Sequence, residues 1–116
     1  MAGPRLLIVD DEPSLLDLLR RYLTRLGYEV ETAGTAAGAL AIFTKDPSFS
    51  LVITDLALDG LNGEDLIEQM RKLKPGLPGL IASGYPYEPR LKHVVFLLKP
   101  FLPAALGEAV ERVLKA

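Results

Sequence analysis

Five short apolar runs, separated by segments with helical spacing, constrain the fold of this chain more than any other feature of its sequence. The runs are Leu6–Val9, Tyr28–Ala33, Leu51–Thr54, Leu80–Ser83 and Val94–Leu98. A run such as the first, which is apolar at every position, is typical of a parallel strand covered by helices on both faces of a sheet. The alternation therefore predicts an α/β domain with a five-stranded parallel sheet and helices on both sides.

The segments between the runs predict helices with recognisable ends. They extend over residues 13–26, from Thr35 to about Lys45, from Asn62 to a stop at Pro75-Gly76, and over 103–115. Pro13 suits the first turn of a helix, where its missing N–H has no intrahelical partner to lose. Thr35 and Asn62 carry side-chain oxygens that can accept hydrogen bonds from the first free N–H groups of a helix. We see no internal repeat and no linker between domains.

Polar functional groups end or directly follow four of the five apolar runs. They are three carboxylates, a hydroxyl and an ammonium group, from Asp10, Asp11, Asp55, Ser83 and Lys99. In an open parallel sheet the carboxyl ends of the strands lie at one edge, which is where such sheets bind their ligands. The sequence therefore predicts that these five side chains converge on one site.

The chemistry of this group favours phosphoryl transfer to Asp55. Three clustered carboxylates repel one another and cannot all stay ionised without a cation. A hard divalent ion with oxygen ligands, most simply Mg²⁺, removes the conflict and leaves Asp55 able to attack phosphorus. The transition state spreads negative charge over the phosphoryl oxygens, which the metal and Lys99 would stabilise while Ser83 donates a hydrogen bond.

Each of these residues, taken singly, has an ordinary structural interpretation. An acidic pair after a strand is usually a solvated turn or a helix cap, Ser-Gly pairs mark loops, and surface lysines are common. The single histidine, His93, is expected to be a loop residue before the fifth run. The combination is far more specific than its parts, because the four positions fall at the same sheet edge in the right order.

Composition excludes several other classes of function. The 116 residues fit one domain, 1–116, and the absence of cysteine excludes disulfides and thiolate catalysis. With 13 Lys and Arg against 15 Asp and Glu, the chain lacks a basic field for nucleic acid or an anionic membrane. The apolar runs are too short for a membrane span or a signal peptide, so we expect a cytoplasmic protein.

These motifs make the chain resemble a receiver domain of the two-component response regulators, the CheY-like family, over essentially its whole length. The resemblance rests on Leu-Leu-Ile-Val-Asp-Asp at 6–11, Leu-Val-Ile-Thr-Asp at 51–55, Ser83-Gly84, and Phe-Leu-Leu-Lys-Pro at 96–100. It implies a flavodoxin-like three-layer sandwich with strand order 2-1-3-4-5. It also implies a switch that catalyses its own phosphorylation, rather than a turnover enzyme.

The resemblance implies a role for each acceptor-site residue. Asp55 would accept a phosphoryl group from a phosphohistidine on a sensor histidine kinase or a histidine phosphotransfer protein. Asp11 would bind Mg²⁺ directly and Asp10 through water, and the backbone carbonyl of Ala57 would complete the protein ligands.

The resemblance also implies how the signal would be transmitted. The Lys99–Pro100 peptide bond would be cis, which aims the lysine at the site. Ser83 would move toward the phosphoryl group while Phe96, the switch aromatic, turns inward, which is a population shift between two packings. Ala57 and Tyr85 offer no carboxylate or amide to orient attacking water, so we expect no accelerated dephosphorylation from these two positions.

The chain departs from the family between the fourth and fifth runs. Lys99 follows Ser83 by only 16 positions, and the intervening segment contains Pro86 and Pro89. The fourth helix of the family must therefore be shortened, displaced or absent here. This helix normally forms part of the output face, so signalling through that face is expected to be altered. Asp59, where the family often has proline, is interpreted as a surface turn and not as a ligand.

Three other classes of protein compete with this interpretation. A degenerate receiver would act as a protein-interaction module without phosphorylation, although every acceptor position is filled here. A flavodoxin-like nucleotide binder would need a glycine-rich loop after the first run, where this chain has acid instead. A haloacid-dehalogenase-like phosphatase would need a nucleophile there with a second acid two residues on, which Asp10-Asp11-Glu12 fits poorly. The sequence identifies neither the cognate kinase nor an output partner.

Overall fold

The computed structural model describes residues 3–115, and its strands and helices alternate as the apolar runs predict. The order is β1 (Arg5–Val9), α1 (Pro13–Arg25), β2 (Glu29–Ala33), α2 (Ala36–Lys45), β3 (Leu51–Asp55), β4 (Ala57–Leu58), β5 (Leu61–Asn62), α3 (Gly63–Met70), β6 (Gly79–Ser83), β7 (Val94–Leu98) and α4 (Pro103–Lys115). Within the described residues, five strands form a parallel sheet in the order β2-β1-β3-β6-β7. This is the predicted flavodoxin-like order, which is therefore confirmed.

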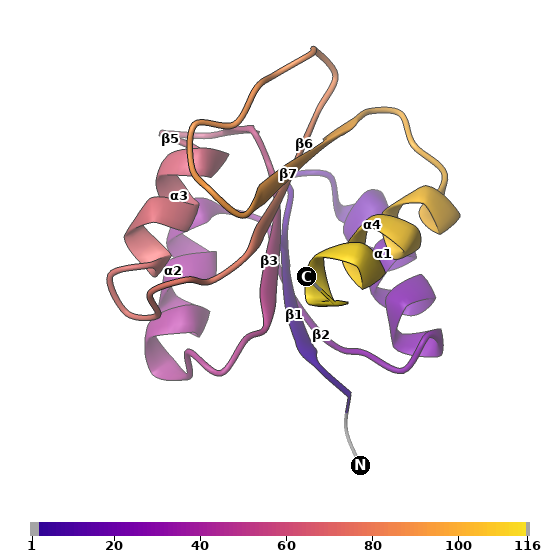
Figure 1. The fold of residues 1–116 in the computed structure, drawn as a ribbon, viewed down its shortest axis with the longest axis horizontal. Helices are drawn as coiled ribbons and strands as arrows, with labels where there is room; N and C mark the ends of the chain where they lie inside the picture. Colours follow the sequence, from indigo (N-terminus) through magenta and orange to yellow (C-terminus); the bar gives the residue numbers. More distant parts are fainter. Residues whose placement is uncertain (1–2, 116) are drawn as a thin grey trace.

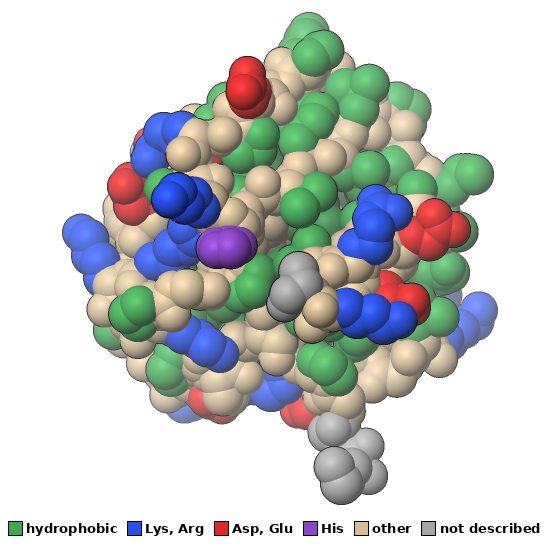
Figure 2. All heavy atoms as spheres, in the orientation of Figure 1, with side chains coloured by type: hydrophobic (Ala, Val, Ile, Leu, Met, Phe, Trp, Pro, Cys, Tyr) green, Lys and Arg blue, Asp and Glu red, His purple; other side chains and the backbone are tan. Residues whose placement is uncertain are grey.

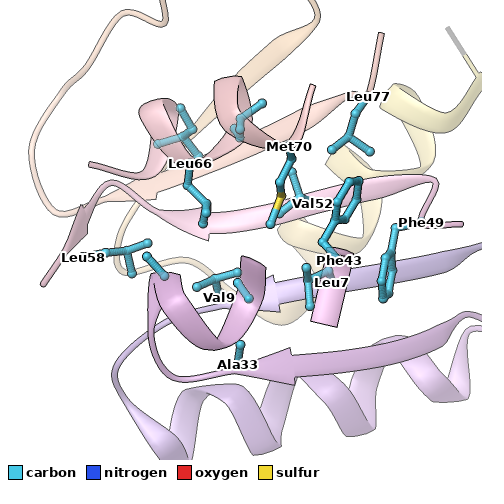
Figure 3. Close-up of a cluster of buried hydrophobic side chains, with 14 residues drawn as sticks. Leu7, Val9, Ala33, Phe43, Phe49, Val52, Leu58, Leu66, Met70 and Leu77 are labelled. Carbon is cyan, nitrogen blue, oxygen red and sulfur yellow. The ribbon is translucent and has the colours of Figure 1, made fainter. Parts of the chain in front are cut away.

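Helices cover both faces of the sheet and make it the middle of three layers. Figure 1 shows α2 and α3 on one side and α1 and α4 on the other. Successive strand residues point to opposite faces, so neighbours such as Leu6 and Leu7 belong to different apolar clusters. Figure 3 shows the cluster under α2 and α3, in which Leu7 and Val52 from the sheet meet Phe43 and Met70 from the helices. The two clusters fix the sheet from both sides.

Helix caps account for where α2 and α3 begin. The Thr35 hydroxyl accepts a hydrogen bond from the N–H of Gly38 at 2.9 Å. The Asn62 side-chain oxygen accepts from the N–H groups of Glu64 and Asp65, at 2.7 and 3.1 Å. Both caps were predicted, and each satisfies N–H groups that have no partner inside the helix.

Two local features differ from the sequence-based expectation. Helix α3 ends at Met70 and does not continue to Pro75, because the carbonyl of Met70 accepts from both Leu73 and Lys74 and the chain closes into tight turns. The segment between Asp55 and α3, expected to be a loop, contains the two-residue strands β4 and β5 in an antiparallel pair. Gly60 lies at the turn between them with φ of 77°, a left-handed conformation that glycine adopts without strain.

The β6–β7 connection, residues 84–93, contains no helix at all. Of the three outcomes predicted from Pro86 and Pro89, a shortened, displaced or absent helix, the structure has the last. A looped segment lies beside α3 where the family has a helix between the fourth and fifth strands of the sheet (Figure 1). Figure 2 shows apolar side chains gathered over this part of the molecule and over the side on which the chain leaves β7. Among residues 3–115, no helix combines the length and apolar character that crossing a membrane requires.

Candidate functional site

Strand register brings the predicted residues to one edge of the sheet. Val9 pairs with Thr54, so Asp10 and Asp55 occupy adjacent strand ends. Asp55 pairs with Ala82, which places Ser83 beside the end of β3. The apolar parts of these strands are held in the core, so their ends are fixed and the polar groups that follow them face a common space. The predicted convergence is therefore present in the structure.

The three carboxylates form a compact cluster. Oxygen atoms of Asp10, Asp11 and Asp55 all lie within 4.8 Å of one another. Asp10 is 4% exposed, whereas Asp11 is exposed to solvent. Both oxygens of Asp10 have partners: Oδ1 accepts from the N–H of Glu12 at 3.0 Å, and Oδ2 accepts from Lys99 at 2.6 Å. Asp10 is thus the fixed member of the cluster, and Asp11 and Asp55 are the more open ones.

Lys99 provides the positive charge of the site. Its Nζ lies 2.6 Å from Oδ2 of Asp10 and 3.7 Å from Oδ2 of Asp55. Its backbone N–H donates to the carbonyl of Ser83 at 2.7 Å, and the Lys99–Pro100 peptide bond is cis, as predicted. Burial acts to lower the pKa of Lys99, but its hydrogen bond to Asp10 and the negative charges around it outweigh burial and raise that pKa. The side chain therefore stays protonated.

The acceptor candidate Asp55 is held in an environment that opposes its charge. Burial raises the pKa of the Asp55 carboxyl, and the charges of Asp10 and Asp11 add to this, while Lys99 acts in the opposite direction. The net direction of the pKa is upward, because burial and the neighbouring carboxylates together outweigh Lys99 and the hydrogen bond from the backbone of Ala57. A divalent cation would relieve the remaining repulsion, so the electrostatics of the site favour metal binding.

The remaining predicted residues surround this cluster. Ser83 is 6% exposed, and its Oγ accepts from the N–H of Tyr85 at 3.1 Å. Phe96 is partly buried, with its ring 6.5 Å from that of Tyr87. Ala57 is exposed in β4, directly after the end of β3. The arrangement places a carboxylate nucleophile, an ammonium group and a hydroxyl around a site suited to a cation. These are the functional groups that phosphoryl transfer requires.

The sequence suggests Gly63 as a loop residue after Asp55, but not its close approach to the acceptor strand. Gly63 is the first residue of α3, and a Cβ there would lie 2.2 Å from the carbonyl oxygen of Asp55. Its N–H donates to the carbonyl of Leu56 at 2.7 Å. The absence of a side chain is what lets α3 begin directly against the acceptor strand. A glycine beside the Asn62 cap is the only sequence signal of this contact.

Replacing Gly63 with alanine is expected to lower the free energy of unfolding by about 1–3 kcal/mol, because an overpacked site forces the backbone to move. The urea midpoint measures this change. Gly34→Ala is the matched control, since the nearest atom to its new Cβ would be the Asp10 carbonyl oxygen at 4.0 Å, an ordinary contact. Equal midpoints for the two variants would contradict the close approach.

Comparison with known proteins agrees with this geometry. The sequence matches the response regulator receiver domain family over residues 6–111. The transcriptional regulatory protein GlrR of Escherichia coli is 35% identical over 116 residues, which span 95% of this chain and 26% of GlrR. The chain thus spans about a quarter of the length of that relative.

Solved structures give the same result. The receiver domain of the hybrid histidine kinase CckA has a TM-score of 0.86 at 32% identity, covering 95% of this chain and 98% of that one. The response regulator protein TrrA of Thermotoga maritima, in complex with Mg²⁺ and BeF, has a TM-score of 0.84 at 30% identity, covering 96% of this chain and 99% of that one. The chain therefore belongs to the response regulator receiver domain family of two-component systems.

Proposed function

We propose that the chain, residues 1–116, is a phosphorylation switch in which Asp55 accepts a phosphoryl group from a phosphohistidine on a histidine kinase or a histidine phosphotransfer protein. The observation that carries this proposal is the Lys99 ammonium group, held between Asp10 and Asp55 within the carboxylate cluster. Residues 1, 2 and 116 lie outside the described structure. We place the reaction in the cytoplasm, with no direct contact to nucleic acid or membrane.

The carboxylate cluster fits Mg²⁺. Octahedral magnesium holds its oxygen ligands at about 2.1 Å, so ligand oxygens on opposite sides lie about 4.2 Å apart. The spacing of at most 4.8 Å between carboxylate oxygens is close to this value. Asp11, Asp55 and the backbone carbonyl of Ala57 would hold the ion directly, and Asp10, whose oxygens both already accept hydrogen bonds, would hold it through water. The ion would neutralise the cluster and the charge on the phosphoryl oxygens.

The protein groups then have distinct tasks. One carboxylate oxygen of Asp55 forms the new O–P bond while the P–N bond to the donor imidazole breaks and its electron pair returns to the ring nitrogen. Lys99 stabilises the charge on the phosphoryl oxygens, and the hydroxyl of Ser83 donates to one of them. Ser83 and Phe96 would rearrange together and change the surface that an output partner contacts. All these positions are filled, which argues against a phosphorylation-independent receiver.

Titration with Mg²⁺ and beryllofluoride tests the proposal, since the complex of TrrA holds this analogue. We expect Mg²⁺ alone to shift amides around the carboxylate cluster, and beryllofluoride to add a second saturable set of shifts at Asp55, Ser83 and Lys99 only when Mg²⁺ is present, because the analogue needs the metal to offset the carboxylates. EDTA should reverse the shifts. A spectrum that does not respond to Mg²⁺ and beryllofluoride together would exclude the proposed switch.

A further inference from the structure

Glu64 is a buried carboxylate outside the acceptor cluster. Its side chain is 0% exposed, and both of its oxygens have partners. Oε2 accepts from the backbone N–H groups of Arg90 and Leu91, each at 2.8 Å, and Oε1 accepts from the hydroxyl of Tyr87. A buried charge is unfavourable without such donors, and these three, with the positive end of α3, provide them. We call these contacts of Glu64 with Tyr87, Arg90 and Leu91 the Glu64 latch.

The latch provides acceptors for backbone N–H groups that a helix in this segment would pair internally. In a helix, the N–H groups of Arg90 and Leu91 would donate to carbonyls four residues earlier. Pro86 and Pro89 prevent that arrangement, and Glu64 supplies the acceptor from another element. The guanidinium of Arg90 adds ion pairs with Asp65 and Glu68 on the surface of α3, but such exposed pairs contribute little. The buried contacts of Glu64 therefore hold the β6–β7 connection in place.

Tyr87 links the latch to Phe96. Their ring centroids are 6.5 Å apart with the rings tilted by 55°, a favourable geometry for an aromatic pair. Both rings pack against the apolar cluster under α2 and α3. The hydrogen bond to Glu64 and burial raise the pKa of Tyr87, so its hydroxyl stays protonated and able to donate. One side chain thus contacts both the buried carboxylate and the switch aromatic.

The two ends of the latch are attached to the acceptor site. On one side, Glu64 directly follows Gly63, whose N–H donates to Leu56 at 2.7 Å beside Asp55. On the other side, the β6–β7 connection begins after Ser83, whose Oγ accepts from the N–H of Tyr85. Both ends of the latch are thus joined to segments that lie next to Asp55 and Ser83.

We propose that Glu64 is a positioning residue of the switch, which holds Phe96 in its present packing through Tyr87 and thereby opposes the phosphorylated state. This inference rests on the proposed phosphorylation of Asp55. If Phe96 turns inward, its ring must leave Tyr87 or draw Tyr87 away from Glu64. A ligand that binds the rearranged state must supply the free energy that separates it from the present state. Because the latch stabilises the present state, it lowers the affinity for a phosphoryl group.

The Tyr87→Phe variant tests the latch because it removes only the hydroxyl and keeps the ring against Phe96. Hydrogen bonds to a carboxylate are among the stronger ones, and their loss should favour the rearranged state. We expect the affinity for beryllofluoride at saturating Mg²⁺ to rise about tenfold, which corresponds to about 1.4 kcal/mol. Amide exchange of residues 84–93 without the analogue should also become faster. Tyr28→Phe, on the opposite face of the sheet, should change neither quantity.

Variants of Glu64 separate positioning from a purely structural role. Glu64→Ala should tighten analogue binding at least as much as Tyr87→Phe, whereas Glu64→Gln keeps one acceptor oxygen and should lie between wild type and Glu64→Ala. Should Glu64→Ala fail to fold, the Tyr87→Phe result decides alone. Faster exchange with unchanged or weaker analogue binding would overturn the inference. A wild-type protein that does not bind the analogue would instead overturn the proposed function, and the latch with it.

Discussion

Asp55→Asn is expected to abolish phosphoryl labelling of the protein by acetyl phosphate in the presence of Mg²⁺. The amide has no carboxylate oxygen to attack phosphorus, and no other residue of the cluster is both open and beside Lys99: Asp10 is buried with both oxygens engaged. The amide is close to the carboxylate in size, so the fold should be retained. The mass of the intact protein after incubation measures the result, with one added phosphoryl group on the wild type and none on the variant.

Asp59→Asn is the matched control for this experiment. Asp59 is an exposed carboxylate in the turn between β4 and β5, four residues after Asp55. Its replacement by asparagine removes one negative charge, as Asp55→Asn does. It should label like the wild type. Undiminished labelling of Asp55→Asn would show that the phosphoryl group enters elsewhere and would end the case for this acceptor.

Lys99→Ala is expected to slow phosphorylation of Asp55 by about 10²–10³, the usual effect of removing one preorganised charge or donor from a transition state. The lysine is held 3.7 Å from Asp55, so it is already positioned where negative charge develops. Rates of labelling by acetyl phosphate at saturating Mg²⁺ measure the effect. Because the variant also leaves Asp10 without its 2.6 Å partner, the urea midpoint measured in EDTA should fall and Mg²⁺ should restore part of it.

Lys92→Ala provides the comparison for Lys99→Ala. Lys92 is an exposed lysine of the β6–β7 connection, and the ion pairs of Asp10 and Asp55 in the described structure are with Lys99 and not with Lys92. Its labelling rate should equal that of the wild type. Equal rates for Lys99→Ala and the wild type would mean that the metal alone supplies the positive charge, and Lys99 would then be a structural partner of Asp10.

Most of the sheet and the acceptor cluster could be predicted because local sequence determines both. An apolar run such as Leu51–Thr54 is typical of a covered strand, and in a parallel sheet the polar residue at its end lies at the carboxyl edge. The departure at the β6–β7 connection was also visible, since Pro86 and Pro89 exclude a regular helix. These features depend on residues that are neighbours in the chain.

Features that depend on distant residues could not be predicted. In the sequence Glu64 looks like an acid in the first turn of a helix, a position that is usually solvated and favoured by the helix dipole. Nothing near it indicates that Tyr87, 23 positions away, donates to it. The close approach of Gly63 to the Asp55 carbonyl, and the early end of α3 at Met70, likewise follow from packing and turn geometry that appear only once the elements are assembled.

The contact between Asp10 and Lys99 joins residues 89 positions apart, one directly after β1 and the other directly after β7. During synthesis, the acidic residues emerge long before the lysine that offsets them. Parallel strands also assemble late, because each needs a crossover before it can pair. A nascent or truncated polypeptide would carry the aspartate yet lack the ammonium group beside it. Under the proposed function, such a chain would present the acceptor carboxylate without Lys99 and would be phosphorylated far more slowly than the complete domain.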